Sequence, residues 1–89
     1  MNKVAFKNLL IYFKQLVYDK RYSILEGTLA EYIAWLCYSI VHFKRDYHEY
    51  INQLEVCELY TKQKNYDLLI TYLEDNIIYW DLACDEEDY

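Results

Sequence analysis

The stretch Thr28–Phe43, TLAEYIAWLCYSIVHF, is the most continuously apolar segment of the chain and decides its fold class. Apolar residues recur along it at alternating steps of four and three, which is the repeat of one helical face. These residues are Leu29, Ile33, Leu36, Ile40 and Phe43. A helix that is apolar over most of its circumference has to be covered from several sides. The pattern therefore predicts a helix over about residues 28–43 at the centre of the molecule.

Two Ser/Thr-x-x-Glu capping boxes lie near the start of this helix, Ser23–Glu26 and Thr28–Glu31. The second box comes directly before the dense apolar pattern and is the expected start. Whether the first box already begins the helix stays open at this level. At the other end, Lys44 and Arg45 suit a helix C-terminus, where cations meet the partial negative charge of the helix.

Three further segments carry helical apolar patterns, so we expect an all-α, compact four-helix bundle. The first covers about residues 2–19, and its inward stripe consists of Phe6, Leu9, Leu10, Phe13, Leu16 and Val17. The third follows a predicted cap at Asp46. Its inner face consists of Tyr47, Tyr50, Ile51, Leu54 and Cys57. The fourth runs from a predicted cap at Asn65 to about Leu82, and its inner face consists of Leu69, Ile70, Leu73, Ile77 and Trp80.

The composition favours one helical domain over residues 1–84, followed by an acidic tail over 85–89. A chain of 89 residues without proline and with one glycine has little of the chemistry that tight β-turns need. Three widely spaced cysteines without a CxxC pair indicate a reduced, cytoplasmic protein rather than a disulfide framework. Lysines interrupt the N-terminal segment, which is unlike a signal peptide. The central apolar segment is too short, and too polar at Glu31 and His42, to suggest a membrane span.

Charge is divided unequally between the two halves of the chain. Residues 1–45 hold seven bases and three acids, whereas residues 46–89 hold two bases and twelve acids. Their net charges of +4 and −10 give the total of −6, and no base follows Lys64. This segregation is the most informative functional feature of the sequence.

The fourth helix displays the negative charge as a stripe that also contains apolar and aromatic groups. Aromatic anchors surrounded by charge are typical of protein interfaces. Together with one acid of the third helix, the stripe gives the candidate partner-binding residues, Glu49, Asp67, Glu74, Asp75, Ile78, Tyr79 and Asp81. An acidic outer face also occurs on soluble helices for solubility alone. The twelve tyrosines, too many for the interior of so small a bundle, either present surface for binding or pack at helix seams.

Other kinds of site find less support in the sequence. His42 and His48 are six residues apart and lack the three- or four-residue spacing of helical metal ligands. No motif predicts a catalytic residue, a metal or a cofactor. The net charge disfavours direct binding of nucleic acid. The basic face formed by Lys3, Lys7 and Lys14 could instead meet the acidic half of a second copy, so a homodimer stays open.

These features favour a non-enzymatic inhibitor or immunity-type protein. Its acidic, tyrosine-bearing helical face would bind a basic partner, such as a nuclease toxin or another nucleic-acid-handling protein. The alternative is a helical adaptor or regulatory protein that docks a partner helix or self-associates. In that case the acids only solvate the surface.

Overall fold

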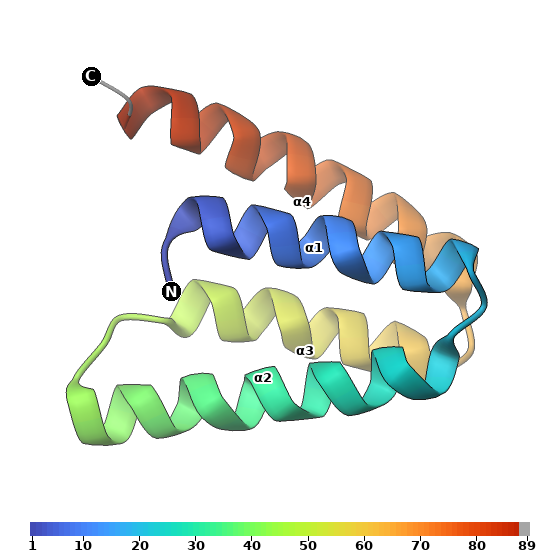
Figure 1. The fold of residues 1–89 in the computed structure, drawn as a ribbon, viewed down its shortest axis with the longest axis horizontal. Helices are drawn as coiled ribbons and strands as arrows, with labels where there is room; N and C mark the ends of the chain where they lie inside the picture. The colour runs from blue at the N-terminus through green and yellow to red at the C-terminus, as the bar shows by residue number, and fades with distance from the viewer. Residues whose placement is uncertain (88–89) are drawn as a thin grey trace.

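The computed structural model describes residues 1–87, with side chains through Cys84, and contains four helices in that range. They are α1 (Lys3–Tyr18), α2 (Tyr22–Phe43), α3 (His48–Lys62) and α4 (Tyr66–Glu87). Successive helices run in opposite directions (Figure 1). α1 packs mainly on α4, and α2 packs mainly on α3. The predicted all-α, four-helix bundle is confirmed.

The bundle is flattened, with principal extents of 36, 30 and 16 Å. Its radius of gyration of 13.0 Å slightly exceeds the roughly 12 Å expected for a compact chain of this length. In Figure 1, α4 lies along one edge of the molecule and α2 along the opposite edge. A flat bundle of this kind leaves the outer sides of its edge helices uncovered.

All six residues of the predicted inward stripe of α1 are buried. Asn2 caps the start of the helix, since the side-chain oxygen accepts a hydrogen bond from the Ala5 amide at 2.8 Å. Phe6 stacks on Tyr50 of α3 at 4.4 Å between ring centroids and meets the edge of Trp80 of α4 at 5.5 Å. The Trp80 indole N–H donates a buried hydrogen bond of 2.8 Å to the Gln53 side-chain oxygen. This aromatic cluster joins three of the four helices.

The prediction that the segment 28–43 lies at the centre of the molecule is wrong. α2 begins at Tyr22, so both capping boxes lie inside the helix, and it buries only Leu25, Leu29, Leu36 and Ser39. Phe43, expected inside, is 62% exposed. The apolar side chains of α2 are spread around its circumference, and the flat bundle covers only one side of them.

α2 is also longer than the apolar pattern suggested. By length and composition it is the one helix in the described part of the chain that could cross a membrane, although only 22% of its most apolar window is buried. The expectation that this segment is too short and too polar for a span therefore does not hold by length and composition, because the helix starts at Tyr22 rather than near Thr28.

Two other boundaries differ from the prediction. α3 starts at His48 after Tyr47, so Asp46 does not cap it. α4 continues to Glu87 and includes the first three residues of the predicted tail, while residues 88 and 89 lie outside the described part. The predicted cap at Asn65 is present, because its side-chain oxygen accepts a long hydrogen bond of 3.4 Å from the Leu68 amide.

Candidate protein-binding site

Two of the predicted carboxylates face the lysines of α1. Asp81 lies 3.1 Å from the Lys7 ammonium, and Glu74 lies 3.7 Å from that of Lys14. Glu74 also accepts a long hydrogen bond of 3.4 Å from the Tyr18 hydroxyl. Because α1 packs directly on α4, the basic face of the first half of the chain compensates part of the acidic stripe within the molecule. The stripe is therefore less negative than the sequence suggests.

Asp67 and Asp75 are not compensated in this way. Both are exposed, and within residues 1–84 neither carboxylate takes part in an ion pair. Ile78, one turn from Asp75, is 61% exposed. These three predicted residues share the side of α4 that points away from the bundle.

Leu68 and Leu82 belong to the same side, and the sequence analysis did not select them. They are 48% and 61% exposed, and their spacing from Asp75 was the available signal. Alternating steps of three and four place five residues in one row along the helix, namely Leu68, Thr71, Asp75, Ile78 and Leu82. We define the α4 outer face as Asp67, Leu68, Thr71, Asp75, Ile78 and Leu82.

Neither Tyr79 nor Glu49 belongs to this face. Tyr79 is 49% exposed and packs edge-on against the Trp80 ring at 4.9 Å. Glu49, in the first turn of α3, lines a shallow hollow of about 160 Å³ with Lys3, Asp46, Tyr50 and Trp80. The structure therefore brings Asp67, Asp75 and Ile78 onto one surface and separates Glu49 from them.

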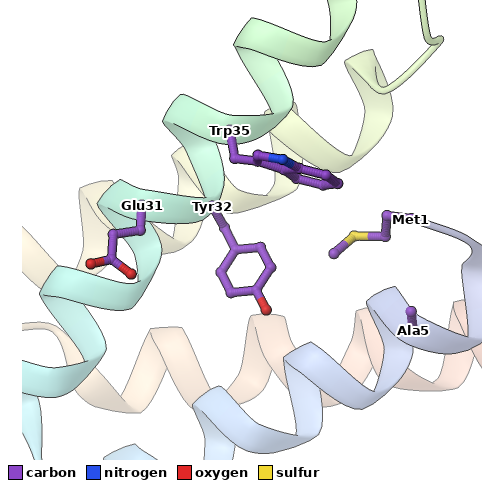
Figure 2. Close-up of a pocket in the computed structure, with 5 residues that line it drawn as sticks. All are labelled: Met1, Ala5, Glu31, Tyr32 and Trp35. Atoms are coloured by element: carbon purple, nitrogen blue, oxygen red, sulfur yellow. The ribbon is translucent and has the colours of Figure 1, made fainter. Parts of the chain in front are cut away.

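A second uncovered region is a groove between the start of α1 and the second half of α2. Its wider part, of about 480 Å³, is lined by Met1, Ala5, Glu31, Tyr32 and Trp35. Figure 2 shows the Trp35 and Tyr32 rings and the Met1 side chain bordering the same space. An adjoining hollow of about 330 Å³ shares Met1 and Trp35 and reaches Phe43, Arg45 and Tyr47. The sequence analysis missed this groove because the pattern placed α2 inside the core.

The tyrosines divide between the two roles considered for them. Tyr22 stacks on Tyr66 at 4.0 Å between centroids, and Tyr60 meets Tyr72 edge-on at 6.1 Å. These partly buried pairs join helices at their seams. Tyr12, Tyr18, Tyr38 and Tyr79 are instead about half exposed. The fold therefore uses some of the tyrosines for packing between helices, while others contribute to the exposed surface.

The groups that could carry other chemistry are dispersed. Within the described residues, no three His, Cys, Asp or Glu side chains gather as metal ligands. His42 stacks on Tyr38 at 4.1 Å. All three cysteines are free, and burial raises the pKa of the Cys57 thiol to about 12, which makes it a poor nucleophile.

Comparison of the chain with protein-family models, curated proteins and solved structures gave no match. Its function therefore has to be inferred from its own surface.

Proposed function

We propose that this chain is a non-enzymatic binding protein that docks a basic protein partner on the α4 outer face. The observation that carries the proposal is the position of Asp75 beside Ile78 and Leu82. Its carboxylate lacks an ion pair within residues 1–84, and both apolar neighbours are 61% exposed. Exposed apolar side chains next to an uncompensated charge fit a partner that offers an apolar surface and a cation together.

The charge of the whole chain supports the same kind of partner. With a net charge of −6 and no base after Lys64, the α4 side attracts cationic surfaces and repels anionic ones, which speeds encounter with a basic protein. A nuclease toxin or another nucleic-acid-handling protein is a partner of this class, and the chain would then act as its inhibitor or immunity protein. The three free cysteines suit a reducing, cytoplasmic setting.

A second candidate is a helical adaptor in which the acids only solvate the surface. It is favoured by the apolar residues Leu68, Ile78 and Leu82, which belong to one row with steps of three and four along α4, the spacing with which a helix receives a partner helix. It is also favoured by the ion pairs of Lys7 with Asp81 and Lys14 with Glu74, which lower the net charge of the stripe. Both candidates use the α4 outer face. They differ in how much charge attraction contributes to the affinity for the partner.

The test of the site uses the full chain as bait for proteins of its host. We expect one captured partner to be lost when Ile78→Ser and Leu82→Ser are combined, because binding would bury both side chains. Thr71→Ser is the matched control on the same face and should retain the partner. Equal capture by the wild-type and Ile78→Ser/Leu82→Ser baits would show that the α4 outer face is not the binding site.

A further inference from the structure

The side of α2 that points away from the bundle is unusually apolar for a surface. It presents Ile24, Tyr38 and Val41, which are 45–71% exposed. Trp35, which is 48% exposed, lies at its edge, where the indole ring borders the groove lined by Met1 and Tyr32. The smaller Gly27, Ala30 and Ala34 between them are exposed as well. We define these seven residues as the α2 outer face. A Cβ atom on Gly27 would meet nothing within 4 Å, so the subunit itself leaves this side of the helix uncovered.

The size of this face is close to what an interface needs. Aromatic side chains offer roughly 150–250 Å² each, so half-exposed Trp35 and Tyr38 with Ile24 and Val41 leave on the order of 400 Å² of apolar area. A patch of that size is at the level that marks a functional surface on a monomer. With a polar rim, it approaches the roughly 800 Å² per partner of a standard interface.

The charges at the two ends of α2 indicate which partner fits. Glu26 and Glu31 flank the first half of the helix, after the base Arg21 that precedes it, whereas Lys44 and Arg45 follow its end and precede Asp46. None of these side chains is in an ion pair within residues 1–84. At a rise of 1.5 Å per residue, the two glutamates and the two bases after the helix are roughly 24 Å apart along the axis. A second α2 running antiparallel would place its Lys44 and Arg45 beside these glutamates.

We propose that the α2 outer face is the interface of a two-fold symmetric homodimer in which two α2 helices pack antiparallel. The pairing of acids with bases sets the two-fold axis between residues 35 and 38. Tyr38 of both subunits then lies at the centre of the interface, where aromatic side chains contribute most to affinity. Trp35 lies at the edge of the interface, beside the groove. Ala30 and Ala34 allow the two backbones to approach closely.

The same reasoning excludes the α4 outer face as the dimer contact. It carries Asp67 and Asp75 and no base, so two copies would bring like charges together, and its partner has to be a different, basic protein. An anionic lipid surface fits α2 poorly, because a protein of charge −6 is repelled by it. The dimer is therefore independent of the proposed function and leaves the α4 outer face accessible.

Sedimentation velocity over a dilution series tests the proposal. We expect the wild-type chain to reach twice its 11.0 kDa mass. Val41→Glu should raise the dimer Kd about tenfold or more, while circular dichroism shows an intact helical fold. Ile78→Glu, at a site of similar exposure on α4, is the matched control and should remain dimeric. A monomeric wild-type chain would overturn the proposal, as would monomer formation by Ile78→Glu but not by Val41→Glu.

Charge exchange tests the antiparallel arrangement separately. Glu31→Lys and Arg45→Glu should each weaken the dimer, because each places like charges opposite one another. Combining both substitutions in one chain should restore most of the affinity, since the two ends are then exchanged together. Failure of the combined variant to recover would reject the antiparallel arrangement. A different outcome would assign the face to a membrane. In that case the wild-type chain would be monomeric and would bind vesicles of neutral lipid, whereas Val41→Glu would not bind them.

Discussion

At the scale of single residues, the core contains a buried hydrogen bond between the side chains of Trp80 and Gln53. The donor and the acceptor are both buried, and the bond length is 2.8 Å. Gln53→Ala would leave the indole N–H without a partner, so we expect the free energy of unfolding to fall by about 1–3 kcal/mol. Urea unfolding measures this loss. Asn52→Ala, at the exposed neighbouring position, should change it by less than about 0.5 kcal/mol.

The buried thiol of Cys57 makes the stability of the fold depend on pH in the alkaline range. Burial raises the pKa of its thiol from 9.0 to about 12, so the unfolded chain releases this proton well before the folded chain does. The stability that the neutral thiol supplies is present below pH 9 and is lost as the pH rises from 9 to 12.

The wild-type chain should therefore lose about 1 kcal/mol more stability than Cys57→Ala on going from about pH 8 to pH 10. All other titrating groups are common to both proteins, so they cancel in this comparison. Cys37→Ala, at an exposed thiol, should behave as the wild-type chain does. Parallel loss in all three proteins would contradict the burial of Cys57.

Sequence alone predicts many of the core residues of α1, α3 and α4, because the helical repeat groups the residues of each inner face. Leu69, Leu73 and Trp80 of α4 are buried as expected. The burial of Gln53 could not be predicted in this way, because its hydrogen-bond partner is a tryptophan 27 residues away in the chain. Periodicity identifies which side of a helix is apolar, but it does not pair one helix with another.

At the scale of the elements, α1 and α3 end in the same hydrogen-bonded turn. The Arg21 amide donates to the Leu16 carbonyl, and the Asn65 amide donates to the Tyr60 carbonyl, both at 2.9 Å. This closure requires a left-handed residue, which is glycine in most proteins. Here the residues are Lys20 and Lys64, with φ of 58° and 57°.

Glycine at either position should stabilise the fold, because a side chain in the left-handed region costs about 1 kcal/mol. We expect Lys20→Gly and Lys64→Gly each to raise the free energy of unfolding by about 0.5–1 kcal/mol. Lys62→Gly, inside the last turn of α3, should lower it by about 1 kcal/mol. Thermal unfolding of the three variants measures whether each one is more or less stable than the wild-type chain. Destabilisation by Lys20→Gly and Lys64→Gly would refute the interpretation of these turns.

The start of α2 shows why its sequence pattern was misleading. Ser23 and Thr28 have the residue types of helix caps, but the helix begins before both of them, at Tyr22. Packing decides the start, because buried Leu25 and the stacking of Tyr22 on Tyr66 hold the first turn in place. A capping box is a local preference of about 1 kcal/mol, and such tertiary contacts exceed it.

At the scale of the whole molecule, the charge asymmetry of the sequence is only partly retained in space. The sequence predicts the sign of each half, but not that α1 packs on α4 and places Lys7 and Lys14 beside Asp81 and Glu74. Among the predicted carboxylates of α4, the negative charge that stays uncompensated is that of Asp67 and Asp75 on the α4 outer face. The candidate site is therefore narrower than the predicted stripe and includes two leucines that charge patterning could not reveal.

The same flat architecture gives the molecule two different outer surfaces. The α4 outer face combines acids with apolar residues and suits a basic partner, whereas the α2 outer face is apolar at its centre with opposite charges at its ends and suits a second copy. An inhibitor built in this way would be a dimer with two outward-facing binding sites. Its stoichiometry with a monomeric partner would be two to two.

The salt dependence of partner binding tests the central claim most directly, namely that uncompensated carboxylates on α4 recognise a basic protein. The measurement is the Kd of the captured partner by calorimetry at low and high ionic strength, for the wild-type chain and for Asp67→Asn/Asp75→Asn. We predict that salt weakens wild-type binding by about tenfold or more, and that the double substitution removes most of this dependence. A wild-type Kd that does not change with salt would contradict the claim and favour the helical adaptor.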